Sequence, residues 1–350
     1  MERPHNPHTY INRRKFLRLS GILGAGLAVG GILPVSAEAV KFNTDEYKVD
    51  ETRSAMSTTV TMILIHPSKT EAQEAIGRAF EEIYRLEGLM NRFDDSTAVG
   101  SLNRQGSLIG IPSEVLEVIR SSLRYHGVTG GNFDITVKPV IELFSCASQG
   151  KSRYPDKREI EEAFGLVGSS KIEINGRDIR FRQPGMGITL DGIAKGYIVD
   201  RASALLSRYN IRNHLINAGG DIRARGSQQG NRPWKVAVQD PQKKGEYPDI
   251  IHLNDGAIAT SGNYEVYFDS ERMSHHIVDP KTGLSPMMST SVSVLAKTAM
   301  EADAFSTSVF VMGHEAGTRF IDSRPGCESL VLQKMGKAFR SAGWCARAAI

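Results

Sequence analysis

The chain has 350 residues, of which 40% are hydrophobic and 23% charged, so it can bury the core of one large domain or two modest ones. Its formal net charge of +4 comes entirely from residues 1–37, and the rest of the chain has equal numbers of acidic and basic side chains. A neutral body offers no basic face to a phosphate backbone, which argues against a nucleic-acid-binding protein.

The first 37 residues have the features of an export signal. Arg13 and Arg14 precede an uncharged, glycine-rich stretch that ends in small residues, the pattern of a cleavable signal. Paired arginines before a weakly hydrophobic stretch indicate the twin-arginine route. We therefore expect a periplasmic protein that is cleaved near Ala37 or Ala39. The alternative is an uncleaved membrane anchor, for which this stretch is marginal in length and apolarity.

Three cysteines limit the thiol chemistry of the chain. An oxidising compartment permits one disulfide, with Cys327–Cys345 the favoured pair, and leaves Cys146 as a spare thiol. Because the sequence has no C-x-x-C motif or Cys/His cluster, it argues against structural zinc and thiol redox chemistry.

The first part of the chain predicts a strand and two helices. Residues 38–55 are mostly polar and predict a flexible lead-in, whereas Thr58–Ile65 alternates and is β-branched like a strand. Ser68–Met90 has apolar residues at helical spacing, and either Thr70 or Ser68 can cap this predicted helix. Pro112–Tyr125 predicts a second helix with its proline in the first turn.

The later part predicts mainly short strands. Helices are expected at Lys157–Phe164, Ala194–Tyr209 and Ala299–Met312. β-Branched runs separated by Gly, Pro and Asn predict strands. These runs are Asn213–Ala218, Trp234–Gln239, Ile250–Leu253, Ala257–Thr260, Tyr264–Phe268, His276–Val278 and Ser291–Leu295. Helices grouped early and strands grouped late predict an α+β fold with largely antiparallel sheets and packed helices.

Two glycine-containing turns carry groups that suit a phosphate. Gly131–Thr136 places an acid and a hydroxyl beside a turn, although a capped turn is the simpler interpretation. Thr189–Gly196 runs from a strand into a helix, where backbone N–H groups and Lys195 can face a phosphate. The chain has no Walker loop, and no G-x-G-x-x-G follows a predicted strand, so neither a P-loop nor a Rossmann site is indicated.

Two further segments carry groups that suit proton transfer or a metal. His275 and His276 lie in a predicted strand, so their side chains face opposite ways, and a structural histidine is the alternative. Asp303 and Thr307 are four residues apart in a predicted helix and share a face. A carboxylate and a hydroxyl suit Mg²⁺ or Ca²⁺, and an ordinary acid stabilised by the helix dipole is the alternative.

The order of these motifs resembles the FAD:protein FMN transferase family, the ApbE-like proteins. The resemblance extends over about residues 56–313 and implies that family's α+β fold, with a flavin site between lobes of a single domain over residues 56–350. The matching blocks are Met90–Ser96 with Leu102–Asn103, Gly131–Thr136 with Pro139, Leu190–Asp200, Ala218–Asp221, Ala259–Gly262, His276–Gly283, and Ala302–Thr307 with Gly313.

The resemblance implies an enzyme that takes FAD, transfers its FMN half to a Ser or Thr hydroxyl of a target flavoprotein, and releases AMP. It implies that Mg²⁺, or Ca²⁺ in its place, is held by the Gly192 carbonyl, Asp303 and Thr307, and that His276 accepts the proton of the incoming hydroxyl. The implied FAD-binding residues are Met56, Phe93, Asn132, Phe133, Asp134, Thr189, Lys195 and Ile277.

One position departs from the family pattern. Many members have an acid where Thr189 stands, and Asp191, two residues later, is displaced along a strand by about 6–7 Å. Members of the NosX-type periplasmic branch tend to have Thr there. This favours a periplasmic or membrane-associated flavoprotein of a respiratory complex as the acceptor.

Two other functions remain open for the same residues. In an FAD pyrophosphatase, water would replace the acceptor hydroxyl, and FMN and AMP would both be released. A non-catalytic flavin-binding protein that assembles a respiratory redox complex is the second alternative, and the Asp303/Thr307 pair argues against it.

Replacing Arg13 and Arg14 together by lysine is expected to block export, because the receptor reads the arginine pair rather than its charge. Cell fractionation should find the wild type cleaved in the periplasm and the variant uncleaved in the cytoplasm. Normal periplasmic accumulation of the variant would contradict the twin-arginine prediction.

Overall fold

A computed structural model describes residues 11–12, 38–41, 45–148, 155–241, 246–263, 275–334 and 336–344. Most of the predicted signal, the predicted strand Tyr264–Phe268, and Cys345 lie outside these ranges, so the signal and the Cys327–Cys345 disulfide remain predictions. Within the described ranges, no helix is both long and apolar enough to cross a membrane.

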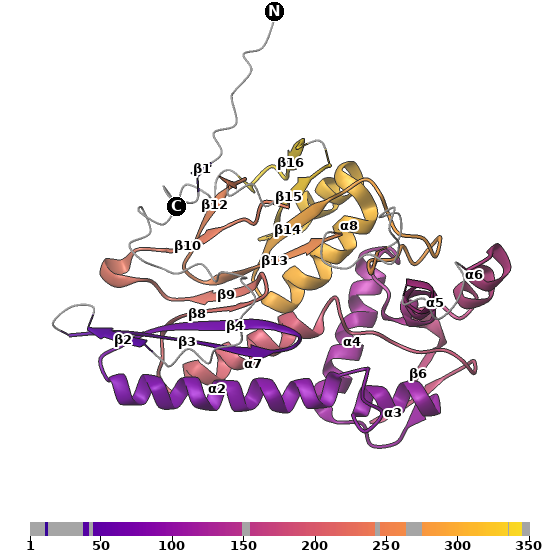
Figure 1. The fold of residues 1–350 in the computed structure, drawn as a ribbon, viewed down its shortest axis with the longest axis horizontal. Helices are drawn as coiled ribbons and strands as arrows, with labels where there is room; N and C mark the ends of the chain where they lie inside the picture. Colours follow the sequence, from indigo (N-terminus) through magenta and orange to yellow (C-terminus); the bar gives the residue numbers. More distant parts are fainter. Residues whose placement is uncertain are drawn as a thin grey trace, which may run out of the picture.

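An antiparallel sheet forms the centre of the molecule (Figure 1). Among the described residues it has nine strands in the order β16-β15-β14-β13-β9-β8-β4-β3-β2. The strands are β2 (Glu38–Lys41), β3 (Tyr47–Ala55), β4 (Thr58–His66), β8 (Asn213–Ala218), β9 (Asp221–Arg225), β13 (Gly256–Gly262), β14 (Ser291–Ala296), β15 (Glu328–Leu332) and β16 (Ala338–Arg340). The predicted α+β class with antiparallel pairing is therefore confirmed.

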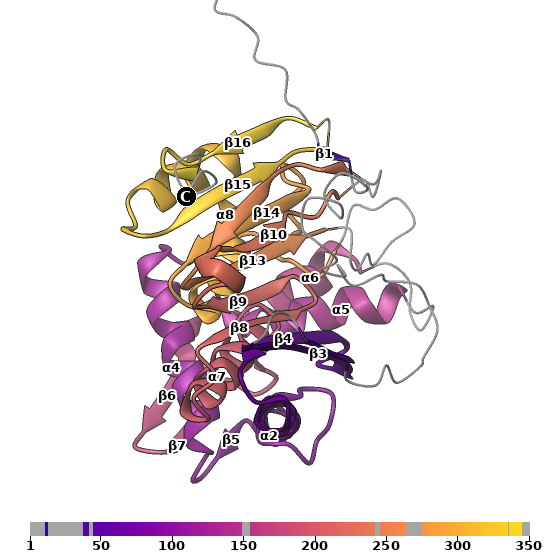
Figure 2. The same ribbon diagram turned by 90° about the vertical axis from the view of Figure 1, so that its left-hand side faces the viewer.

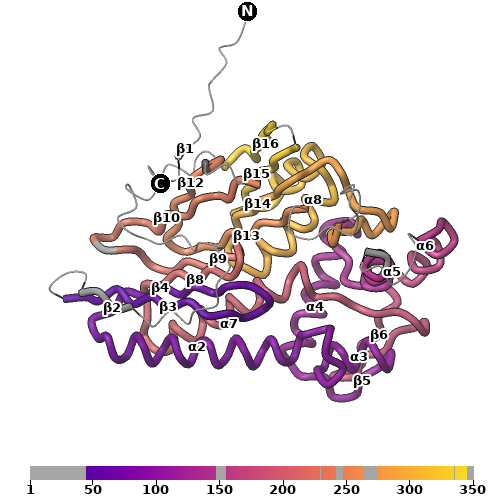
Figure 3. Tube along the Cα trace, in the orientation of Figure 1, coloured from indigo at the N-terminus to yellow at the C-terminus, as the bar shows by residue number. Residues whose placement is uncertain are grey.

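Three helices cover one face of this sheet: α2 (Lys69–Met90), α7 (Ala194–Arg208) and α8 (Ala299–Asp322). Figure 2 shows α2 nearly end-on beneath β3 and β4, and Figure 3 shows it alongside α7. The predicted apolar face of α2 is buried, and Ser68 caps the helix by accepting from the Glu71 N–H at 3.3 Å. The main apolar core lies between these helices and the sheet.

The opposite face of the sheet packs against a small hairpin-like pair of strands. β10 (Trp234–Ala237) pairs with β12 (Ile250–Leu253), and their buried side chains form a second apolar cluster with residues of the sheet and with Trp344. β1 (Ile11–Asn12) pairs with β11 (Glu246–Tyr247). Strands β4, β8, β9, β13, β14 and β15 thus have buried apolar residues on this face as well.

The remaining elements form a smaller group at one end of α2, to the right in Figure 1. Its helices pack on α2 and α8 through α4, and its short strands pair in the order β5-β7-β6. The elements are α3 (Ala98–Gln105), β5 (Ser107–Leu108), α4 (Ser113–Val128), α5 (Lys138–Ser148), α6 (Lys157–Phe164), β6 (Ile172–Asn175), β7 (Asp178–Phe181) and the 3-10 turns Ile135–Val137 and Ser169–Lys171. Another 3-10 turn, Gln229–Asn231, lies outside this group and precedes β10.

The prediction of a flexible lead-in over residues 38–55 is wrong where β2 and β3 lie. β3 is hydrogen-bonded to β2 on one edge and to β4 on the other. Only Val49 and Ala55 of β3 are buried, and the polar residues between them are mostly half-buried. The polar composition hid a strand whose stability comes from pairing on both edges rather than from an apolar face.

Two predicted helix boundaries are also adjusted by the structure. Pro112 is the residue before α4 rather than part of its first turn, and it adopts φ −51° and ψ 140°. The last helix loses its helical backbone at Gly313, where φ is 76° and ψ is 174°. This break directly follows the predicted end at Met312, and a further helical stretch continues beyond it.

His214 is a buried histidine that links β8 to α7. Its Nδ1 donates to the Ile211 carbonyl at 3.0 Å, so its Nε2 accepts from the Ser203 hydroxyl at 2.7 Å. Burial lowers the pKa of His214 to about 4. The folded protein therefore holds a neutral imidazole at a pH where the unfolded chain binds a proton.

Because the unfolded state binds more protons between pH 4 and 6.5, His214 should make stability fall as pH decreases through that range. Between pH 7.5 and 5 the wild type should lose about 2 kcal/mol from this group. Urea unfolding at the two pH values should show a smaller loss for His214→Gln. An equal loss in the wild type and in His214→Gln would contradict the assignment.

Candidate active site

The turn before α7 brings backbone N–H groups to the edge of the core. The Leu190 carbonyl accepts from the Ile193 N–H at 3.0 Å and from the Ala194 N–H at 2.8 Å, which closes the turn. Leu190 and Ile193 are buried and anchor the turn. The positive end of the α7 dipole therefore lies at a fixed place, as an anion-binding site requires.

Helices α7 and α8 lie in close contact at Gly196. A Cβ atom there would lie 2.3 Å from the Ala299 carbonyl oxygen. The Gly196 N–H donates to Oδ2 of Asp303 at 3.2 Å. In the other direction, Asp200 of α7 accepts from the N–H groups of Ala299 and Met300 at 3.0 and 2.9 Å. Each helix thus caps the start of the other with a carboxylate.

Two buried acids and one lysine lie beside this crossing. Asp303 is 4% exposed and Asp221 is 2% exposed, and Lys195 Nζ is 3.1 Å from Oδ2 of Asp221. Burial raises the pKa of the Asp303 carboxyl well above its usual value, and the charge of Asp221 raises it further, while Lys195 lowers it. Burial also raises the pKa of Asp221, against the influence of Lys195. Two carboxyl groups therefore share one cation.

Gly192 and Thr307 meet one helical turn beyond Asp303. A Cβ on Gly192 would lie 2.9 Å from Thr307 Oγ1 and 3.5 Å from Cε2 of Phe133. Any larger residue at 192 would push the turn away from α8. The structure thus brings Gly192, Asp303 and Thr307 to one place, although they come from two distant segments of the chain.

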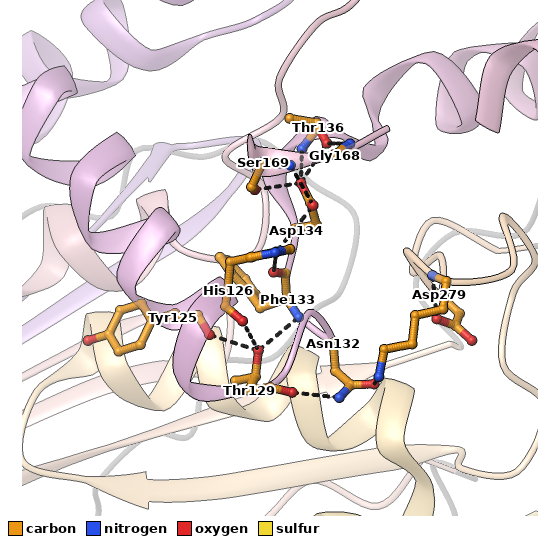
Figure 4. Close-up of polar contacts among 11 residues, drawn as sticks. Tyr125, His126, Thr129, Asn132, Phe133, Asp134, Thr136, Gly168, Ser169 and Asp279 are labelled. Atoms are coloured by element: carbon orange, nitrogen blue, oxygen red, sulfur yellow. Dashed lines mark hydrogen bonds and ion pairs between the residues drawn. The ribbon is translucent and has the colours of Figure 1, made fainter. Parts of the chain in front are cut away.

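The side chain of Asp134 fixes the conformation of the Gly131–Thr136 turn by hydrogen bonds (Figure 4). The Asp134 carboxylate accepts from the N–H groups of Thr136 and Ser169 at 2.8 and 3.0 Å, and His126 Nδ1 is 3.2 Å from it. Burial alone would raise the pKa of Asp134, but the bonds from His126, Thr136 and Ser169 lower it. With its side chain 2% exposed, Asp134 faces the protein interior and fixes the turn.

The same turn contacts the segment that carries His276. Oδ1 of Asn132 accepts from Lys281 Nζ at 3.1 Å, and its Nδ2 donates to the Thr129 carbonyl at 2.6 Å. The Phe133 N–H donates to the Thr129 hydroxyl at 3.1 Å. Asn132 therefore joins the two predicted blocks.

The predicted strand His276–Val278 is wrong: the segment is an irregular turn. His275 is fully buried, with its Nε2 3.0 Å from the Pro286 carbonyl, and its Nδ1 accepts from the Ile277 N–H at 3.3 Å. Pro280 lacks an N–H group, and the Gly283 N–H closes the turn onto the Asp279 carbonyl at 2.9 Å. His276 is half-buried and Ile277 is buried.

Met56 and Phe93 lie near the carboxyl end of α2. Met56 turns the chain between β3 and β4 with φ 53°, and its N–H donates to Glu87 of α2 at 2.8 Å. Phe93 is 79% exposed, and the Arg92 guanidinium lies 4.0 Å from the centre of its ring. Met56 packs against the main core, whereas the Phe93 ring is open to solvent.

Asp191 does not take the place of the family acid at Thr189. Thr189 is buried, its N–H donates to the Ile135 carbonyl at 2.8 Å, and its hydroxyl accepts from the Asp191 N–H at 3.2 Å. The Asp191 carboxylate instead pairs with Arg92 at 3.1 Å. Thr189 therefore caps the turn, and Asp191 faces the side on which Phe93 lies.

The structure adds partners that sequence reasoning missed. Asp221 and Ser261 entered the sequence analysis only as parts of the matching blocks Ala218–Asp221 and Ala259–Gly262, yet they contact Lys195 and Thr307. Arg92 was noted only as part of a block. An acid directly after two glycines, at the start of a strand, is the signal that could have singled out Asp221 in advance.

The groups that could hold a cation at this site are a carboxylate, a hydroxyl and a backbone carbonyl, all of which bind through oxygen. Among the described residues, no three His, Cys, Asp or Glu side chains cluster in a way that could hold a metal ion. What the turn and α8 bring together is one carboxylate, one hydroxyl and one backbone segment. Such a set suits a hard cation rather than zinc.

The sequence model of the ApbE family matches residues 56–331. The chain belongs to the ApbE family. The FAD:protein FMN transferase of Vibrio cholerae is 31% identical over 264 residues, 72% of this chain and 76% of its own, and that of Haemophilus influenzae is 32% identical over 66% and 68%.

Solved structures agree with this family membership. The ApbE protein of Thermotoga maritima aligns over 86% of this chain and 99% of its own, at 29% identity, with a TM-score of 0.79. The flavin transferase ApbE from Vibrio cholerae has the same coverage at 27% identity and a TM-score of 0.73. The predictions of this family, its fold and an enzyme are confirmed.

Gly196→Ala is expected to destabilise the protein by about 3 kcal/mol or more, because the added methyl group would collide with the α8 backbone. Gly77→Ala, in α2, is the matched control: a Cβ there meets nothing within 4 Å, and the change should stabilise the helix by up to about 1 kcal/mol. Thermal unfolding of both variants measures the difference. A Gly196→Ala protein as stable as the wild type would contradict the close helix approach.

Proposed function

We propose that this protein transfers the FMN half of FAD to a Ser or Thr hydroxyl of an acceptor flavoprotein and releases AMP, with Mg²⁺ bound in the site. The observation that supports this most directly is the meeting of Gly192, Asp303 and Thr307 at the start of α7. It occurs in a chain whose relatives are FAD:protein FMN transferases.

The residues present fit a divalent cation. Asp303 and Asp221 are both buried and share Lys195, so the buried site has an excess of negative charge if both are ionised. The Asp303 carboxylate, the Thr307 hydroxyl and the Gly192 carbonyl would hold Mg²⁺, or Ca²⁺ in its place. When bound, the ion neutralises the pyrophosphate and the charge that develops on the leaving AMP.

The start of α7 and Lys195 bind the pyrophosphate in this proposal. The positive end of the α7 dipole attracts an anion. Lys195, which is 3.1 Å from Asp221, is close enough to the turn to be shared with a phosphate. The exposed ring of Phe93 supplies apolar surface for the flavin.

The reaction joins the acceptor oxygen to the flavin-side phosphorus. The bond from that phosphorus to the oxygen of AMP breaks, and the hydroxyl proton passes to His276. His276 is suited to this because it is half-buried, whereas the adjacent His275 is held inside the protein by Pro286 and Ile277. His275 is thereby a positioning residue for the turn.

The location and the acceptor are part of the same proposal. The paired arginines at Arg13 and Arg14 support export by the twin-arginine route to the periplasm. Thr189, in place of an acid, supports a flavoprotein of a respiratory complex as the acceptor. A protein that modifies such a subunit would act where the subunit faces the periplasm.

Asp303→Asn should lower the rate of FMN transfer by about 10²-fold or more, because the charge that holds Mg²⁺ is lost. The amide oxygen can still accept from the Gly196 N–H, so the melting temperature in chelator should stay near the wild-type value. Covalent flavin fluorescence of the acceptor on a denaturing gel measures transfer, and chromatography of AMP in the same reaction measures cleavage.

Glu301→Gln is the matched control, since Glu301 is an acid in the first turn of the same helix and should affect only the helix dipole. An Asp303→Asn enzyme that transfers FMN at the full rate with added Mg²⁺ would contradict the proposed role. AMP release by the wild type without flavin on the acceptor would identify a pyrophosphatase instead.

A further inference from the structure

Two hydroxyl groups, those of Ser261 and Ser306, connect the Thr307 hydroxyl to the backbone of α8. Ser261 of β13 has its Oγ 2.8 Å from Ser306 Oγ and 3.2 Å from Thr307 Oγ1. The Ser306 hydroxyl in turn donates to the Asp303 carbonyl at 2.9 Å. Ser306 is fully buried, so these groups satisfy one another rather than water.

The direction of the hydrogen bonds follows from counting protons. A carbonyl oxygen only accepts, so the single proton of Ser306 goes to Asp303. The 2.8 Å contact between Ser261 and Ser306 then needs the proton of Ser261, because two oxygens at that distance repel without one. Ser261 has no second proton to give, so the proton in its contact with Thr307 comes from Thr307.

This order leaves the lone pairs of Thr307 facing away from Ser261. Among the described residues, Ser261 is the one hydrogen-bond partner of the Thr307 hydroxyl. A threonine inside a helix commonly donates to the carbonyl four residues earlier. For Thr307 this is the Asp303 carbonyl, which accepts from the Ser306 hydroxyl instead. The lone pairs of Thr307 Oγ1 therefore face Gly192. A Cβ atom built on Gly192 would lie 2.9 Å from Thr307 Oγ1.

We propose that Ser261 is a positioning residue for the cation site. It accepts a hydrogen bond from the Thr307 hydroxyl and donates one to Ser306, and this arrangement fixes the lone pairs of Thr307 Oγ1 toward the metal. The inference rests on the proposed function, since it assumes the metal role of Thr307. Groups that orient metal ligands in this way change metal affinity by about 10–100-fold when removed.

Mn²⁺ tests the proposal as a probe, because it accepts the same oxygen ligands as Mg²⁺ and its free concentration can be followed by electron paramagnetic resonance. Ser261→Ala should raise the Kd for Mn²⁺ by about 10-fold. Thr307→Val should raise it at least as much. Adding Ser261→Ala to Thr307→Val should cause no further loss, because Ser261 acts through Thr307.

Ser308→Ala is the matched control. Ser308 is also a fully buried serine of α8, and its hydroxyl donates only along the helix, to the Ala304 carbonyl at 2.6 Å. Both serine variants lose a side-chain hydrogen bond, so both should lower the melting temperature in chelator. Only Ser261→Ala should weaken Mn²⁺ binding.

Other outcomes of the Mn²⁺ titrations would overturn either the metal site or the role of Ser261. Wild-type protein without saturable Mn²⁺ binding would overturn the metal part of the proposed function, and this inference with it. If Thr307→Val weakens binding but Ser261→Ala does not, the positioning role alone is overturned. It is also overturned if Ser308→Ala weakens binding equally or if the two losses in the double variant add.

Discussion

The contact between α7 and α8 at Gly196 is the constraint on which the candidate site depends. Helix starts leave N–H groups without partners, and burying them is costly. Here Asp200 and Asp303 each supply the missing acceptor for the other helix, and the absence of a side chain at Gly196 lets the helices come close enough. The crossing fixes the position of Asp303 relative to the start of α7. It also fixes Thr307, one helical turn later, beside Gly192.

The electrostatics of the site are better suited to binding than to stability. Burial raises the pKa of both Asp221 and Asp303, and Lys195 is shared between them. Burying such groups costs free energy unless a ligand or ion completes their charge balance. The large apolar core between the sheet and the three helices offsets this cost, as is common where a site breaks the usual rules of burial.

Much of the fold was predictable because its elements have local patterns. The helical spacing in α2, the four helices predicted after it and the strands β8, β12 and β14 all follow from periodicity and turn residues. The lead-in was wrong because β3 is polar and is stabilised by pairing on both edges. The strand predicted at His276–Val278 was wrong because its β-like residues lead into a turn, which the Gly283 N–H closes onto the Asp279 carbonyl.

The sequence by itself determined the family, through the order of its motifs, and the four-residue spacing that places Asp303 and Thr307 on one helical face. The tertiary structure alone decided the partners of these motifs. It turned Asp134 inward toward His126, paired Asp191 with Arg92, and brought Asp221 to Lys195 and Ser261 to Thr307. Local patterns reflect the period of each element, whereas these contacts join distant segments and depend on how whole elements pack.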